Sequence, residues 1–339
     1  MLTASALRWM HGPGSGLERF TRKLLGFTDN RQDAALQAGH FNDFLFVSLL
    51  RAGFLRALDD AGAQGLRAEE IGKAQQAALG FATRTPEIRA EWLLDPSIRG
   101  VNLEDAEKTL RDVLAYRVWF DQRHGWRYTN PNLEQLGLVA VDYRGMDELV
   151  GDESLFAKAP DVLRYAAPAV RKDVYRALFD HMRRLMAIRS QGLEKEAVEQ
   201  LMSRAYSRLR APWGFGQGEQ PRRTRWMFVV SPARSRISLR DQDLIARGGA
   251  RSALGKTLRE SKLWGGNAAV RALKTKDFET LVTALLEAAK ELGIVTLETS
   301  PFDDQPGWRL VDGAIVFRRS TPEEEVRLKR PANAFFVDL

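Results

Sequence analysis

The stretch from Leu24 to Leu50, LLGFTDNRQDAALQAGHFNDFLFVSLL, constrains the fold of this chain more than any other part of its sequence. Residues 24–28 form a short apolar run that suits a buried strand. Asp29 or Asn30 can cap a helix, and apolar residues then recur at helical spacing. A strand that leads directly into a capped helix is half of an α/β unit, although the pattern alone suits any α/β protein.

Polar residues follow the end of this predicted strand. In open α/β sheets, ligands bind just past the carboxyl ends of the strands. The residues at that place are Thr28, Asn30, Arg31 and Gln32. They are therefore candidates for a ligand contact, with the alternative that Asn30 only caps the helix.

Two blocks of the sequence resemble motifs of a known family. The segment FTDNRQDAALQAGHFNDF, inside the stretch described above, resembles motif IV, which opens the second RecA-like domain of superfamily 2 helicases. The segment GWRYTNPNLEQLGL at 125–138 resembles a second block of that family. The resemblance is closest to the large bacterial DEAD/DEAH-type helicases of phage-defence systems such as DISARM and Druantia.

The resemblance implies a chain that runs from motif IV into an inserted helical and winged-helix region. The ATP-binding motor domain, with its ATP and magnesium, would belong to another part of the parent helicase, and we expect no cofactor in this chain. The implied partners are the missing motor domains and nucleic acid, DNA in the first place. Asn30 and Arg31 would then touch the nucleic-acid backbone, and this chain alone would not hydrolyse ATP.

The composition excludes several kinds of site. The chain has no cysteine, which rules out disulfides, cysteine nucleophiles and cysteine-ligated zinc or iron–sulfur centres. Its four histidines are scattered without the spacing of metal ligands. No apolar run approaches the length of a transmembrane helix, so we expect a cytoplasmic protein with no membrane partner.

The distribution of charge indicates a polyanionic partner. The formal net charge is +7, and residues 203–240 hold nine arginines and one acid, Glu219, with aromatic residues between them. Arginines for phosphates and aromatic faces for bases are typical of a single-strand-binding surface. Its central candidates are Arg222, Arg223 and Arg225. The alternative is a solvated basic loop whose aromatic side chains lie in the core. Three further arginines could extend the basic face: Arg183, Arg184 and Arg189.

A different module is predicted at about 245–320. Residues 276–292 form an amphipathic helix, and strands are expected at 294–298, 308–311 and 314–317, the last two joined by a tight turn at Asp312–Gly313. Helix, helix, strand, loop and strand is the winged-helix pattern. The alternative is a domain that only packs. The exposed candidates for nucleic-acid contact are Lys274, Lys276, Arg309, Arg318 and Arg319.

One apparent motif is interpreted as a chance match. The segment ARSALGKT at 250–257 fits a relaxed phosphate-loop pattern, which needs a buried strand before it and a helix that starts at the lysine. The preceding segment, 239–247, is charged and predicted to be helical. We therefore interpret Lys256 as a surface charge, and no acidic DExH box follows an apolar strand.

Together these patterns predict a mainly α protein with small β elements. Its expected parts are a partial RecA-like α/β unit at 1–60, a helical insertion with the basic aromatic segment at 61–240, a winged-helix domain at 241–320 and a C-terminal tail at 321–339. The expected function is the nucleic-acid-binding portion of a DEAD/DEAH-type helicase of phage defence. The alternative is a stand-alone, non-enzymatic winged-helix DNA-binding protein.

Overall fold

The computed structural model of the chain describes residues 9–10, 14, 16, 18, 31–124, 131–216, 218–232, 242–302 and 305–327. The protein is a mixed α/β structure, 56% helix and 12% strand, with a five-stranded mixed sheet and a small antiparallel sheet. Helix predominates, as predicted. The expected strand at 24–28, with Thr28 and Asn30, lies outside the described residues.

Helix α2 (Arg31–Ala61) is one continuous helix, as its apolar spacing predicted. One face of its second half is buried, with Leu50, Phe54 and Leu58 in the core, and the helix packs there against α3, α5 and β8. The turn after it, η2 (Gly62–Gln64), uses left-handed backbone at Gly62, which costs a glycine little. The short strand β1 (Leu66–Arg67) follows.

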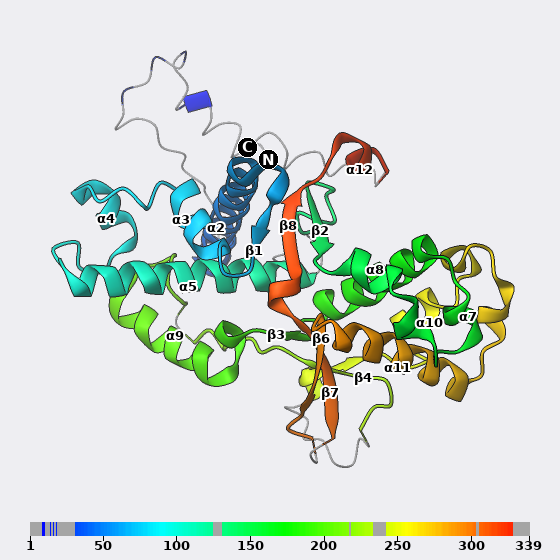
Figure 1. The fold of residues 1–339 in the computed structure, drawn as a ribbon. Helices are drawn as coiled ribbons and strands as arrows, with labels where there is room; N and C mark the ends of the chain where they lie inside the picture. The colour runs from blue at the N-terminus through cyan, green and yellow to red at the C-terminus, as the bar shows by residue number, and fades with distance from the viewer. Residues whose placement is uncertain are drawn as a thin grey trace.

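Helix α5 (Val101–His124) is the spine of the first half of the molecule (Figure 1). It packs against α3 (Ile71–Ala78) on one side and α9 (Lys195–Arg208) on another. The approach of α3 is close, because a Cβ added at Gly72 would lie 2.4 Å from the Arg111 carbonyl oxygen. Helix α4 (Pro86–Trp92) begins at the expected proline, with Thr85 as its cap.

A second group of helices surrounds α8 (Pro168–Arg184). It comprises α6 (Met146–Gly151), η3 (Glu153–Phe156), α7 (Asp161–Arg164), α10 (Ala253–Thr257), η7 (Ser261–Trp264), η8 (Ala268–Ala272) and α11 (Thr275–Glu291). The predicted apolar stripe of α8 is buried, with Val174, Leu178 and Met182 fully inside. The Tyr175 hydroxyl donates to the Leu285 carbonyl 3.1 Å away, which ties α8 to α11.

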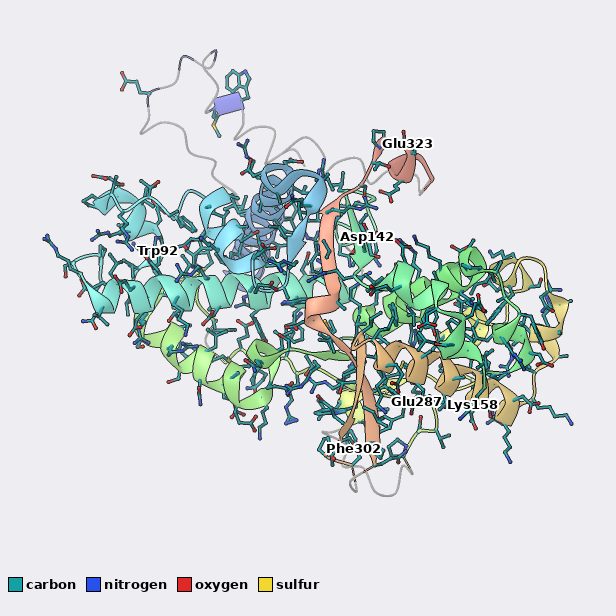
Figure 2. The ribbon with its side chains drawn as sticks, in the orientation of Figure 1. Trp92, Asp142, Lys158, Glu287, Phe302 and Glu323 are labelled. Carbon is teal, nitrogen blue, oxygen red and sulfur yellow. The ribbon has the colours of Figure 1, made fainter. Side chains whose placement is uncertain are left out.

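The small sheet joins segments that lie far apart in the sequence. Its central strand is β8 (Ile315–Arg319), which pairs antiparallel with β1 and with β2 (Val139–Tyr143). Phe317 lies opposite Leu66 on one side and opposite Val141 on the other. Helix α12 (Pro322–Arg327) follows, with Glu323 at the end of the molecule opposite Phe302 (Figure 2).

The five-stranded sheet lies beneath the helices of the second half. It contains β3 (Ile188–Arg189), β4 (Trp226–Phe228), β5 (Ile245–Arg247), β6 (Val295–Thr299) and β7 (Pro306–Val311). Strand β7 pairs antiparallel with β6 and β4 and parallel with β3, and β4 pairs parallel with β5. The 3-10 segment η4 (Gln191–Leu193) leads from β3 to α9.

Two predictions for the C-terminal module are wrong. Strands β7 and β8 do not form a hairpin, because the turn η9 (Asp312–Ala314) carries the chain from one sheet to the other. The hairpin is instead β6–β7, directly after α11. Residues 245–247 are strand β5 rather than helix, because they pair with β4.

One cluster of buried side chains reaches from Leu50 to Phe317 and crosses the expected domain boundaries at 60 and 240. A smaller cluster holds Phe228, Leu244 and Phe302. The boundaries themselves stay a prediction. Over the described part of the chain, no helix is long and apolar enough to cross a membrane.

Candidate nucleic-acid interface

A large open cleft of about 1150 Å³ lies along α5, between α3 on one side and α9 with η4 on the other. In Figure 1, α9 and β3 run beside α5 over this stretch. The volume exceeds that of an ordinary small-molecule pocket, roughly 300–1,000 Å³. The cleft therefore has room for a ligand larger than an ordinary small molecule.

Cations outnumber acids on the walls of the cleft. The basic side chains come from four elements: Lys73 on α3, Lys108 and Arg111 on α5, Arg189 on β3, and Arg204 on α9. The acidic ones are Glu69, Asp112 and Asp312. Cations that converge from several walls concentrate positive potential, and this attracts polyanions.

Three of these cations are free of ion pairs. Among the described residues, Lys73, Lys108 and Arg111 form no salt bridge, and Arg111 donates only a long 3.4 Å hydrogen bond to the Gln76 side chain. Lys73 and Lys108 are exposed. These three groups are called here the free cleft cations. Each can bind a phosphate without first breaking an ion pair with a carboxylate.

Arg204 and Asp112 face each other across the cleft. The Arg204 Nη2 atom lies 3.4 Å from Asp112 Oδ2, and the Arg204 Nε atom is buried without a partner among the described residues. Burial raises the pKa of Asp112 above its usual value, against the opposing effects of Arg204, Lys108 and Arg111. Burial thus disfavours the charged form of the Asp112 carboxylate, while the cations around it favour that form.

The floor of the cleft offers no aromatic face. Tyr116 and Trp119 line it, but each is at most 3% exposed. The Tyr116 hydroxyl accepts a 2.9 Å hydrogen bond from the Arg222 backbone N–H, so the segment after residue 220 lies against this floor. Bases could not stack here, and recognition would rest on charge.

Three of the five aromatic residues in the predicted single-strand-binding surface at 203–240 are not available at the surface. Trp213, Phe215 and Phe228 are buried, as the alternative reading expected. Trp213 packs edge-on against Phe81 at 4.6 Å between ring centres. A buried ring cannot stack on a base, so these three rings form no platform of the kind that single-strand-binding proteins use. Of the other two aromatic residues of the segment, Tyr206 is exposed and Trp226 is half-buried.

The arginines of that segment have varied roles. Arg222 is exposed, while Arg223 and Arg225 are half-buried and have interaction partners. Arg208 lies 3.7 Å from Asp105. Among the described residues of the expected basic surface, therefore, only Arg204 lines the cleft.

The expected extension of the basic face by Arg183, Arg184 and Arg189 is wrong for Arg183, whereas Arg184 and Arg189 are partly exposed but paired with carboxylates. Arg183 is fully buried and donates to Glu134 at 2.7 Å, and Arg184 donates to the same carboxylate. Burial works against the charge of Glu134, but the two arginines outweigh it and hold the pKa of Glu134 at about 2. Arg189, which lines the cleft, is paired with Glu298 at 2.7 Å.

Three C-terminal candidates for nucleic-acid contact instead form ion pairs within the protein. Arg309 is 2% exposed and bonds Glu194, Glu298 and the Ile188 carbonyl, so it was wrongly expected at the surface. Arg318 pairs with Asp142 and Glu324, and Arg319 pairs with Asp59. These pairs fasten β8 to its neighbours, because their carboxylates lie on β2, α12 and α2.

The remaining candidates within the described residues lie at the beginnings of α11 and α2. Lys274 occupies the N-cap position of α11 without a side-chain capping bond, Lys276 lies in the first turn of that helix, and both are exposed. Arg31 and Gln32 are the first two residues of α2. Thr28 and Asn30 lie outside the described residues.

Lys256 is not in a phosphate loop, for a different reason from the one expected. A strand, β5, does precede the segment, but α10 begins at Ala253 and is capped by the Ser252 hydroxyl. Lys256 is therefore inside this short helix rather than at its start, and its side chain is exposed. Gly255 is packed against the Ala250 carbonyl, which leaves no cradle for a phosphate. Across the described ranges, no cluster of histidine and acidic residues could hold a metal ion.

The spacing of two of the free cleft cations along one helix could have indicated their shared surface, whereas the density of arginines along the sequence did not. Lys108 and Arg111 are three residues apart on a helix whose opposite face is apolar, and they share one surface. Lys73 joins them only through the packing of α3 on α5.

Comparison of the chain with protein-family models, with curated proteins and with solved structures finds no match.

Proposed function

We propose that this chain binds nucleic acid through the cationic cleft, as the nucleic-acid-binding portion of a DEAD/DEAH-type helicase of phage defence. The observation that supports it best is the convergence of three free cleft cations, Lys73, Lys108 and Arg111, on one large cleft. The resemblance of the segment 27–44 to motif IV supports the helicase part of the proposal.

The motif IV segment and the cleft are joined by one helix. Helix α2 begins at Arg31 and packs against α3, which carries Lys73. A nucleic-acid contact at Arg31 in the parent helicase would therefore be connected to the cleft through α2 and α3. ATP and magnesium would be bound by motor domains outside this chain, and Arg31 would serve as a positioning contact.

Binding of this kind has a measurable salt dependence. Each phosphate neutralised on a single strand contributes a slope of about −0.7 to log K against log salt. Three cations would contribute about −2 in total. Because the cleft floor has no exposed ring, affinity should depend little on base identity.

The test is fluorescence anisotropy with an oligothymidylate and an oligoadenylate of equal length over a series of salt concentrations. The triple variant Lys73→Ala, Lys108→Ala, Arg111→Ala should bind weakly and with a flatter slope. The control removes the same charge from exposed positions that do not line the cleft: Lys158, Arg251 and Lys262. Figure 2 places Lys158 on the α7 and α11 side of the molecule, away from α9. Equal losses in both triple variants would refute binding in the cleft.

A second candidate is duplex-DNA binding by a winged-helix surface. The observation that favours it is the β6–β7 hairpin directly after α11, with exposed Lys274 and Lys276 at the start of that helix. The double variant Lys274→Ala, Lys276→Ala should then weaken binding to duplex but not to single strands. Unchanged duplex affinity would eliminate this candidate.

A further inference from the structure

We propose that Asp112 is a built-in competitor of the ligand: its carboxylate holds the place on Arg204 that a phosphate of the nucleic acid takes. This inference rests on the proposed function for the identity of its ligand. It adds a regulation of the cleft, in which affinity is set by the protonation of one side chain.

The incomplete bonding of Arg204 is the first observation. Arg309, a structural arginine, donates to the Ile188 carbonyl, Thr224 and Glu194 at 2.7–3.0 Å and is almost fully buried. Arg204 instead makes one long 3.4 Å contact with Asp112, and its buried Nε atom has no partner within the described structure. A guanidinium has five donors in a fork that matches a phosphate. The Nη donors of Arg204 that do not contact Asp112 are therefore available to a better acceptor, whereas the Nε atom is buried.

The position of Asp112 is the second observation. Its own helix places Lys108 one turn before it and Arg111 next to it, and α9 places Arg204 opposite. The other charged groups on the cleft walls are Lys73, Arg189, Glu69 and Asp312. The carboxylate thus lies among the cations that a phosphate would contact, and it repels any anion that enters.

A phosphate on Arg204 would remove the carboxylate's partner and bring a second negative charge near it. Both effects favour the protonated form of Asp112, so binding should be accompanied by proton uptake. The sign follows from linkage: a group that gains protons on binding makes affinity rise as pH falls. The rise should occur in the acid range above the ordinary aspartate pKa of 3.8, because burial already raises the pKa of Asp112.

The experiment compares wild type with Asp112→Asn, which keeps the shape and removes the charge. Its matched control is Asp105→Asn, from the same helix, whose carboxylate pairs with Arg208 and does not line the cleft. We expect Asp112→Asn to bind the oligothymidylate about two- to fivefold more tightly at pH 7.5, the effect of one exposed ion pair. The wild type should approach this affinity as pH falls, while the variant stays flat and the control follows the wild type.

A second probe separates this inference from the proposed function. Inorganic tripolyphosphate carries the phosphate charge without sugar or base, and its binding can be followed by calorimetry. If tripolyphosphate binds Asp112→Asn more tightly than wild type while the oligonucleotide does not bind, the competitor role holds and nucleic-acid binding fails. If the oligonucleotide binds through the free cleft cations but Asp112→Asn binds no more tightly than wild type, the competitor role is wrong. Binding of neither anion to wild type or variant overturns both.

Discussion

Replacement of Arg309 by methionine should destabilise the protein severely, although the sequence placed this arginine among the exposed ones. The guanidinium is 2% exposed and lies 4.9 Å above the Trp226 ring. Its Nη2 atom donates to Glu194 at 2.7 Å and to the Thr224 hydroxyl at 2.8 Å, and both Nε and Nη2 reach the Ile188 carbonyl. Methionine fills similar volume but satisfies none of these acceptors.

The expected loss in the free energy of unfolding depends on which donors remain for the acceptors that Arg309 now bonds. Loss of one partner from a buried charge pair costs about 3–5 kcal/mol when the other charge is left uncompensated. Arg189 stays 3.3 Å from Glu194 and 2.7 Å from Glu298 in the variant, so each carboxylate keeps a cationic partner. The Ile188 carbonyl loses its side-chain donor, and a buried unsatisfied group costs about 1–3 kcal/mol. We therefore expect a loss near the lower end, about 3 kcal/mol.

The assay is urea unfolding followed by tryptophan fluorescence. With a slope of about 3 kcal/mol per molar for a chain of this size, the midpoint should fall by about 1 M. Arg189→Met is the matched control, because it removes an arginine from the same two carboxylates at a position where the side chain is 40% exposed. Its loss should stay within about 1 kcal/mol. Equal losses in the two variants would refute the claim that burial decides the role of these arginines.

Two further predictions concern stability. Because the folded pKa of Glu134 is held at about 2, below the ordinary glutamate value of 4.5, its contribution to stability is present above pH 4.5 and is lost as pH falls toward 2. Glu134→Gln should therefore be less stable than wild type at pH 7, with the difference shrinking toward pH 2 in chemical unfolding; a pH-independent difference would contradict this. Gly72→Ala should cost roughly 1–3 kcal/mol, because its Cβ would meet the Arg111 carbonyl, whereas Gly151→Ala, with open space around it, should be nearly neutral. Similar melting temperatures for the two alanine variants would show that α3 can move away from α5.

The helices could be predicted where the sequence itself holds their signals. Helix α11 has its apolar stripe, with Phe278 and Leu285 buried, and ends before Gly293, which has left-handed backbone. Helix α4 begins with a threonine cap and a proline. Such signals act over a few residues, so they are visible without knowledge of the rest of the chain.

The short strands and the roles of the arginines could not be predicted in the same way. Strands β1 and β3 have two residues each, too few for any period, and exist because β8 and β7 supply their hydrogen bonds. The sequence cannot distinguish Arg309 from an exposed arginine, because its carboxylate partner Glu194 is remote along the chain. Charge density therefore pointed to residues 203–240, whereas packing assembled the cleft from α3, α5 and α9.

The strand β8 also has a consequence for how the protein is made on the ribosome. Both β1 and β2 pair only with β8 in the part of the chain that the structure describes, and Leu66 must wait for Phe317 to be synthesised. During most of translation these two segments have no partner strand, although α2 and α5 are already complete. Unpaired strand edges invite association between nascent chains. Synthesis of β8 thus completes the small sheet, and termination before residue 315 would release a chain whose β1 and β2 edges have no partner strand among the described residues and are prone to associate.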